Sequence, residues 1–97
     1  DVTCSVRVLF VNFGEKEAMQ AMKYVKALRE AGIPAELYPD SAKLKKQMAM
    51  ADSNRIPYVA FVGESELGKD SIVVKNMATG EQQTLTLAQT IELLKLN

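Results

Sequence analysis

Two short apolar runs limit what this chain can fold into. Residues 6–13 (VRVLFVNF) and 58–62 (YVAFV) are almost continuously apolar and rich in β-branched and aromatic side chains. A strand with one face in solvent alternates apolar and polar residues, so unbroken runs are typical of strands that are covered on both faces. We therefore expect two fully buried parallel strands, with residues 6–13 as the central strand of the sheet.

A helical pattern follows the first run. Gly14 breaks the strand, and Glu15 and Glu17 lie where acidic side chains favour a helix start. Gly32 then ends the helix, since glycine takes a left-handed cap at little cost. The spacing of three and four predicts an apolar stripe formed by Ala18, Ala21, Met22, Val25 and Leu28.

The next segment predicts an edge strand and a second helix. Residues 34–38 (PAELY) suit an edge strand, because Pro34 cannot donate to a central ladder. We expect Asp40 or Ser41 to cap the helix that follows. Its inward turns are marked by Leu44, Met48, and Ala51 or Asp52.

The last third predicts a hairpin and a third helix. Residues 71–75 and 82–85 flank a short turn that contains Gly80. Thr86 and Gln89 have the spacing of a capping box, and Leu87, Ile91 and Leu94 supply an apolar stripe.

Together these patterns predict an α/β protein with strands and helices alternating along most of the chain. Right-handed crossovers would give a three-layer α/β/α sandwich with a mixed sheet. The length of 97 residues fits a single domain spanning residues 1–97. Because the chain starts at Asp1 without methionine, we expect a domain cut from a longer polypeptide, a processed terminus being the alternative.

The sequence contains little material for catalysis. It has no histidine and one cysteine, Cys4, which we interpret as a small buried or half-buried apolar residue rather than a nucleophile. Neither Cys-x-x-Cys nor a phosphate-binding glycine loop occurs. We therefore expect no catalytic residue, no metal site and no cofactor in this chain. We also expect no membrane span, since no apolar run approaches the roughly 20 residues that one requires. The helical methionines are expected to fill core gaps: Met19, Met22, Met48 and Met50.

One basic segment is a candidate for binding nucleic acid. The 12 basic and 12 acidic residues cancel, so a polyanion would have to meet a local cluster. Residues 38–47 (YPDSAKLKKQ) contain such a cluster, formed by Lys43, Lys45 and Lys46. Its lysines could contact phosphates, Gln47 could bond a base edge, and Phe13 or Tyr38 could stack on an unpaired base. The alternative is an ordinary solvated helix face, with both aromatic residues packed in the core.

The order of several motifs resembles one known family. Residues 28–67 (LREAGIPAELYPDSAKLKKQMAMADSNRIPYVAFVGESEL) and 74–95 (VKNMATGEQQTLTLAQTIELLK) are similar to the anticodon-binding domain that closes histidyl-tRNA synthetases. The resemblance covers residues 6–95. It implies a five-stranded mixed sheet, three parallel strands plus a C-terminal hairpin, with three helices.

The resemblance also implies a function. We expect the domain to bind the anticodon stem-loop of histidine tRNA, while a separate domain of a cytoplasmic, homodimeric parent performs aminoacylation with ATP and Mg²⁺. The alternative is a regulatory or protein-interaction module that reuses the fold without aminoacylation. The candidate RNA-binding residues are Phe13, Glu15, Tyr38, Lys43, Lys45, Lys46 and Gln47.

Overall fold

Five short strands form one mixed sheet in the order β2-β1-β3-β4-β5 in the computed structural model, which describes residues 6–95. Strand β1 is parallel to β2 and β3, whereas β3–β4 and β4–β5 are antiparallel. The mixed sheet is confirmed, and Cys4 lies outside the described residues. The strands are β1 (Val8–Phe10), β2 (Ala35–Leu37), β3 (Tyr58–Phe61), β4 (Ile72–Asn76) and β5 (Gln82–Leu85).

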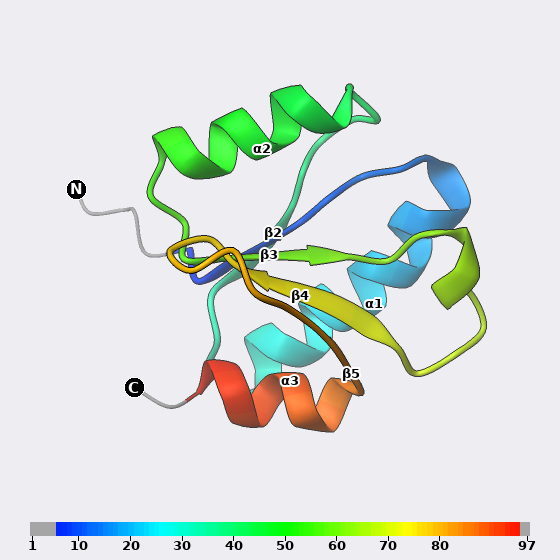
Figure 1. Cartoon of the computed structure of the whole chain (residues 1–97). Helices are drawn as coiled ribbons and strands as arrows, with labels where there is room; N and C mark the ends of the chain where they lie inside the picture. The colour runs from blue at the N-terminus through cyan, green and yellow to red at the C-terminus, as the bar shows by residue number, and fades with distance from the viewer. Residues whose placement is uncertain (1–5, 96–97) are drawn as a thin grey trace.

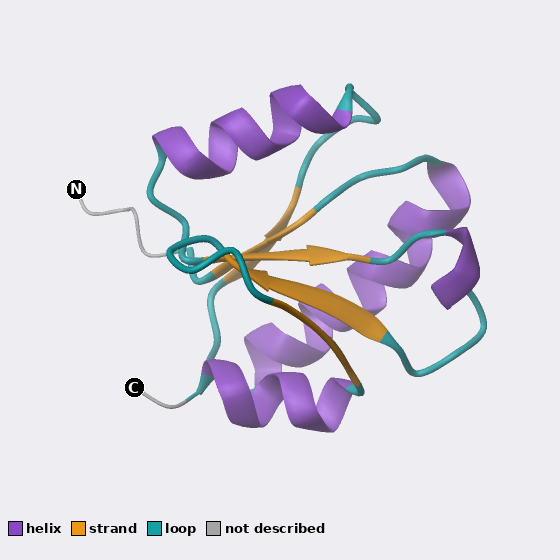
Figure 2. Ribbon diagram, viewed as in Figure 1, coloured by secondary structure: helices purple, strands orange, loops and turns teal. Residues whose placement is uncertain are grey.

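Helices cover both faces of this sheet, which confirms the three layers (Figures 1 and 2). Strand β2 lies on one side of β1 in the sheet and β3 lies on the other side. The two connections therefore run across the sheet in opposite directions, and right-handed crossovers place their helices on opposite faces. Helices α1 (Glu15–Glu30) and α3 (Leu87–Leu94) share one face, and α2 (Leu44–Ser53) lies on the other. A short 3₁₀ helix, η1 (Glu64–Glu66), follows β3 and was not expected.

The apolar character of the first run follows from burial on both sides of β1. Val8 and Phe10 belong to the core beneath α1 and α3, and Leu9 and Val11 belong to the core beneath α2. The expected position is wrong in one respect. Strand β1 is an inner strand, but β3 holds the middle position, because the C-terminal hairpin extends the sheet on the β3 side.

The buried stripe of α1 differs from the predicted one at its flanks. Ala21, Val25 and Leu28 are buried as expected, and Tyr24 joins them, with its ring stacked on Phe10 at 6.3 Å. Two of the four methionines expected to fill core gaps are instead on the surface of α1: Met19 is 64% exposed and Met22 is 45% exposed. Since residues rotate by about 100° along a helix, a stripe that includes Tyr24 turns Met22 outward.

The C-terminal end of α1 has the predicted glycine cap. Gly32 has φ 85°, its N–H donates to the Arg29 carbonyl at 3.0 Å, and the Ile33 N–H donates to the Leu28 carbonyl at 2.9 Å. This pair of bonds is a Schellman motif.

Helix α2 packs on fewer core residues than α1 does. Its fully buried side chains are Gln47 and Ala51, while Leu44 is 45% exposed, so the inward placement of Leu44 was wrong. The predicted caps were also wrong: the N-cap residue is Lys43, without a side-chain cap bond. Asp40 and Ser41 lie before that position, too early in the chain to serve as the cap residue.

A buried amide pair ties α2 to the sheet. The Gln47 Oε1 accepts a hydrogen bond from the Asn12 backbone N–H at 2.8 Å, and Gln47 Nε2 donates to the carbonyl oxygens of Asn12 at 2.9 Å and Ala42 at 2.7 Å. Asn12 Nδ2 donates in turn to the Tyr38 carbonyl at 3.0 Å. These bonds join the ends of β1 and β2 to the first turns of α2.

Helix α2 ends in a second Schellman motif, in which an arginine takes the glycine position. Arg55 has φ 56°, its N–H donates to the Asp52 carbonyl at 3.1 Å, and the Ile56 N–H donates to the Ala51 carbonyl at 2.9 Å. A residue with a Cβ atom is strained there, so the conformation costs free energy that glycine would not require.

The C-terminal hairpin and helix have the predicted turn chemistry. Gly80 has φ 81° in the hairpin turn. Thr86 Oγ1 accepts from the Gln89 N–H at 3.1 Å, and Gln89 Oε1 accepts from the Thr86 N–H at 3.0 Å, which confirms the capping box. Within residues 6–95, no helix has both the length and the apolar character that crossing a membrane requires.

We predict that Gln47→Ala lowers the free energy of unfolding by about 2–3 kcal/mol, because it leaves buried backbone groups of Asn12 and Ala42 without partners. Urea denaturation measures the change. Gln83→Ala is the matched control, since the Gln83 side chain is exposed and its removal should cost less than about 0.5 kcal/mol. Equal effects of the two substitutions would contradict the role assigned to the amide pair.

We predict that Arg55→Gly raises the free energy of unfolding by about 0.5–1 kcal/mol, because glycine relieves the left-handed strain. The added freedom of glycine in the unfolded chain offsets part of this gain. Asn54→Gly is the control: Asn54 has φ −91° and its Nδ2 donates to Met50 Sδ at 2.9 Å, so glycine there relieves no strain, loosens the unfolded chain, removes that bond and should destabilise. Thermal unfolding of both variants separates the two cases.

Candidate nucleic-acid interface

The sheet is covered unevenly on the side of α2. Strands β1 and β3 supply buried residues to the core beneath α2, but the buried residues of β4, Ile72 and Val74, all belong to the opposite core. On the α2 side, β4 presents Val73 and Lys75, which are half-buried. The half of the sheet beyond β3 is therefore open on this side.

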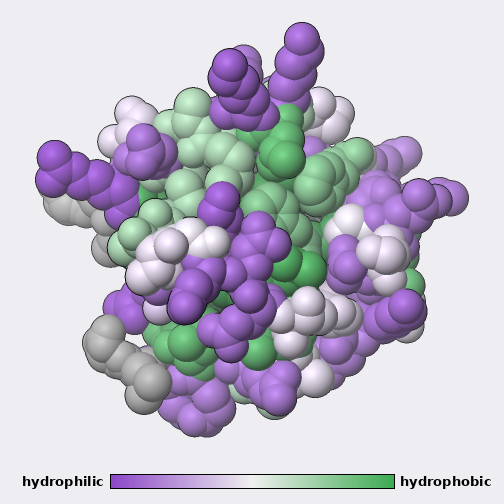
Figure 3. Space-filling model, in the orientation of Figure 1, coloured by the Kyte–Doolittle hydropathy of each residue, from purple (hydrophilic) through white to green (hydrophobic). Residues whose placement is uncertain are grey.

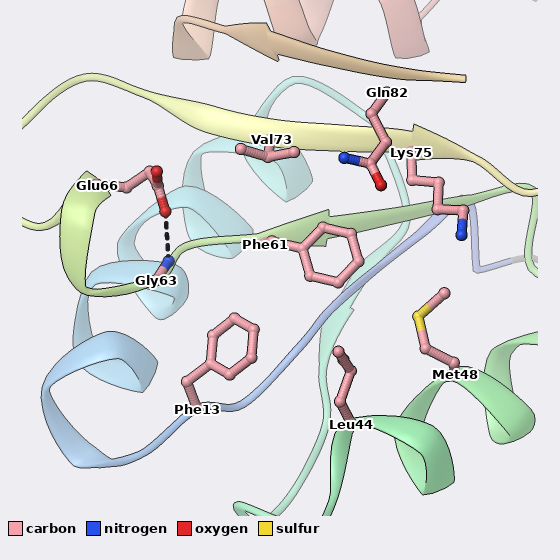
Figure 4. Close-up of a pocket in the computed structure, with 9 residues that line it drawn as sticks. All are labelled: Phe13, Leu44, Met48, Phe61, Gly63, Glu66, Val73, Lys75 and Gln82. Atoms are coloured by element: carbon pink, nitrogen blue, oxygen red, sulfur yellow. Dashed lines mark hydrogen bonds between the residues drawn. The ribbon is translucent and has the colours of Figure 1, made fainter. Parts of the chain in front are cut away.

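A groove of about 420 Å³ lies between α2 and this open half (Figure 4). Phe61 and Val73 lie on its sheet side, and Leu44 and Met48 of α2 line the other side. Figure 3 shows apolar surface in this part of the molecule, with hydrophilic side chains projecting around it. The groove combines apolar walls with a polar rim, as ligand sites commonly do.

Two phenylalanines meet in the groove. Phe13, just after β1, is 42% exposed. Its ring lies 6.3 Å from that of Phe61, centroid to centroid, at an interplanar angle of 27°. Because Phe13 is only partly covered, its side chain has accessible aromatic surface for contact with a further flat group.

The η1 turn forms one end of the groove. The Gly63 N–H donates to Glu66 Oε1 at 2.8 Å, and Ser65 Oγ donates to Glu66 Oε2 at 2.7 Å. Each oxygen of this carboxylate therefore has a donor from its own turn. The turn places a carboxylate near Phe13 without directing a free acid into the groove.

Three exposed lysines surround the start of α2: Lys43, Lys45 and Lys46. Among residues 6–95 the ion pairs are Arg29–Glu36 and Lys95–Glu92, so none of these lysines has a carboxylate partner within 4.0 Å in the described part. The first turn of α2 also lacks an acidic residue and a side-chain cap. Positive charge at a helix N-terminus opposes the helix dipole, so an anion bound here would be favoured.

The predicted site residues separate into two groups. Phe13 lines the groove together with Leu44 of α2, the three lysines are exposed in sequence around Leu44 at the start of that helix, and Glu15 is exposed at the start of α1. The other two are buried: Tyr38 is 8% exposed within the α2 core, and Gln47 is 1% exposed. The Gln47 amide is occupied by its bonds to Asn12 and Ala42, so the structure does not place it where a base edge could reach it.

Of the residues that line the groove, only Phe13 is among the candidate site residues expected from the sequence. Those not expected include Phe61, Lys75 and Gln82. The apolar run 58–62 predicts a fully buried strand for Phe61, and the pattern around Gly80 predicts no more than a hairpin for Lys75 and Gln82. Lys75 of β4 is directly opposite Gln82 of β5 in the antiparallel register, so both side chains lie on the same face of the sheet. A signal was available, because polar residues in β4 and β5 indicate a sheet face that no helix covers.

The chain matches known proteins over nearly all of its length. Residues 5–97 match the family model described as "Anticodon binding domain". The histidine–tRNA ligase of Christiangramia forsetii is 57% identical over 84 residues, which cover 87% of this chain and 18% of that protein.

Solved structures show the same fold. The apo histidyl-tRNA synthetase of S. aureus superposes with a TM-score of 0.81 at 33% identity, over 94% of this chain and 23% of that one. The histidyl-tRNA synthetase of Nostoc gives a TM-score of 0.87 at 26% identity, over 94% and 22%. This chain therefore spans about a fifth of the relatives that it matches, and it belongs to the anticodon binding domain family.

Proposed function

We propose that this chain is the anticodon-binding domain of a histidine–tRNA ligase and binds the anticodon stem-loop of histidine tRNA. The observation that carries the proposal is the placement of Phe13 on a groove beside lysines that have no carboxylate partner among residues 6–95. The histidine–tRNA ligase relatives support the choice of tRNA. Aminoacylation with ATP and Mg²⁺ belongs to a separate domain of the parent, a homodimer of the cytoplasm.

The proposal gives the residues different tasks. Lys43, Lys45 and Lys46 attract phosphates, which supplies affinity without sequence preference. Phe13 stacks on an unpaired base of the loop, the part of an RNA hairpin where bases are free to do so. Glu15, exposed on α1, accepts a hydrogen bond from a base donor in this proposal.

Tyr38 and Gln47 act through the fold in this proposal. Gln47 holds the start of α2 against the end of β1, and so sets where the lysines lie relative to Phe13. Tyr38 packs beneath α2 and offers its carbonyl to Asn12. Substituting either residue should therefore affect RNA binding in proportion to its effect on stability.

One observation favours the second hypothesis, a protein-interaction module. Met19 and Met22 are neighbours on α1 and are both exposed, which is typical of adaptable protein contacts. The two hypotheses differ in which surface matters: RNA binding requires the α2 side of the sheet, and a protein contact at the methionines requires α1.

We predict that the double substitution Lys45→Gln and Lys46→Gln weakens binding of a histidine tRNA anticodon stem-loop about tenfold at low salt. It should also lower the salt slope of log K by roughly one for each phosphate that no longer has a lysine beside it. Fluorescence anisotropy at several salt concentrations gives both quantities. The matched control is Lys23→Gln with Lys26→Gln, which removes the same charge from exposed positions on α1. Equally weakened binding in the two double variants would show only a net-charge effect.

We predict that Phe13→Ala weakens the same complex by about 1–3 kcal/mol, the usual value of one base–aromatic stack. Met19→Ala, which truncates a more exposed apolar side chain on α1, should leave RNA affinity unchanged. Stem-loops with the native and a scrambled anticodon are titrated against each variant. If the native loop binds no better than the scrambled one, specific anticodon recognition by this chain is refuted.

A further inference from the structure

The loop that joins β3 to β4, residues 62–71, makes contacts toward both faces of the sheet. On one face its η1 turn forms the end of the groove, where Gly63 and Glu66 line the cavity near Phe13 (Figure 4). On the other face α1 and α3 supply hydrogen-bond donors to Lys69 and Asp70. The same loop therefore links the candidate RNA site to two helices on the opposite face of the sheet.

Tyr24 of α1 is the buried anchor of this loop. Its side chain is part of the core, where its ring stacks on Phe10. Its hydroxyl donates to the Lys69 carbonyl at 2.9 Å, and Gln20 Nε2 donates to the same hydroxyl at 3.1 Å and to the same carbonyl at 3.3 Å. Because the core holds the ring, the hydroxyl meets the loop at a fixed place.

A second anchor follows directly. Asp70 Oδ1 accepts a hydrogen bond from the Leu87 N–H at 2.8 Å, in the first turn of α3. This bond is exposed to solvent, whereas the bond from Tyr24 is partly buried. Water competes less with a buried bond, so we expect Tyr24 to hold the loop more firmly than Asp70 does.

A short series of hydrogen bonds joins this anchor to the groove. The Lys69 N–H donates to the Glu66 carbonyl at 3.1 Å, and the Glu66 carboxylate accepts from the Gly63 N–H at 2.8 Å. Gly63 lies against Phe13, since a Cβ atom placed on Gly63 would stand 4.0 Å from Phe13 Cε2. The loop therefore supports one side of the Phe13 ring, although Tyr24 lies in the core on the opposite face.

We propose that Tyr24 is a positioning residue for RNA binding: its hydroxyl holds the loop 62–71 from the far face of the sheet, and the loop in turn holds Phe13. The inference rests on the proposed function. Without the hydroxyl, the loop loses its partly buried anchor and samples more positions. RNA binding must then order the loop as well, which lowers affinity although no charge of the site has changed.

Tyr24→Phe tests this role, because it removes the hydroxyl and keeps the ring in the core. We expect a histidine tRNA anticodon stem-loop to bind about three- to tenfold more weakly, the usual effect of one hydrogen bond. The salt slope of log K should not change, since no lysine is removed. In native-state hydrogen exchange, the amides of Glu66 and Lys69 should exchange about tenfold faster. Unchanged exchange at both amides would overturn the inference.

Tyr58→Phe is the matched control. Tyr58 is half-buried in β3, packs against the same core, and its hydroxyl has no hydrogen bond to the part of the chain that the structure describes. Its removal should change neither RNA affinity nor loop exchange. Gln20→Ala is a second test that leaves the buried core intact, and it should speed exchange of the Lys69 amide by a smaller factor. It keeps the inference testable if Tyr24→Phe folds poorly.

A double-mutant cycle with Phe13 separates positioning from a general loss of stability. In a Phe13→Ala background, Tyr24→Phe should weaken RNA binding by less than about twofold, because the ring that the loop supports is absent. Equal weakening in both backgrounds would refute the positioning role.

The remaining outcomes separate this inference from the proposed function. If RNA binding depends on Lys45 and Lys46, but Tyr24→Phe binds the stem-loop as tightly as the unchanged chain does, the proposed function stands and this inference fails. If the unchanged chain does not bind the stem-loop, both are refuted.

Discussion

The buried amide pair of Asn12 and Gln47 is the interaction on which the candidate site depends. Helix α2 has only Gln47 and Ala51 fully buried, so apolar packing alone holds it less firmly than α1 is held. The Gln47 amide bonds both the N–H and the carbonyl of Asn12, much as a neighbouring strand would. Because these bonds are buried, the alternative is unsatisfied polar groups, and the start of α2 is thereby fixed beside the end of β1.

That fixed position creates the groove. Three helices are distributed over five strands, two of them on one face, so the single helix on the other face of the described chain cannot cover the whole sheet. The uncovered part is the antiparallel hairpin, where Lys75 and Gln82 stand in register. A sheet face that is only half covered keeps apolar residues such as Phe61 accessible at the border, which is how this fold combines stacking surface with polar groups.

Charge is used locally in this neutral chain. The lysines at the start of α2 oppose the helix dipole and have no carboxylate partner among the described residues, which costs a small amount of stability in the free protein. Phosphate groups would offset that cost when RNA binds. The other end of the helix also costs stability, because Arg55 has a left-handed conformation at a position where glycine would not be strained. Helix α2 is thus not optimised for stability at either terminus.

The sequence by itself determined the elements whose signals are local: the doubly buried strands, the glycine cap at Gly32, the capping box at Thr86, and the mixed sheet with helices on both faces. The two caps could be predicted because their residues lie within a few positions of one another. The sheet could be predicted because strands and helices alternate along the chain, and right-handed crossovers restrict the topology that follows. Only the tertiary structure decided that Gln47 is buried while Leu44 is exposed, and that Phe13, Phe61, Lys75 and Gln82 line one groove. The physical reason is that the burial of a helix face, or of part of a sheet, depends on which distant element packs against it.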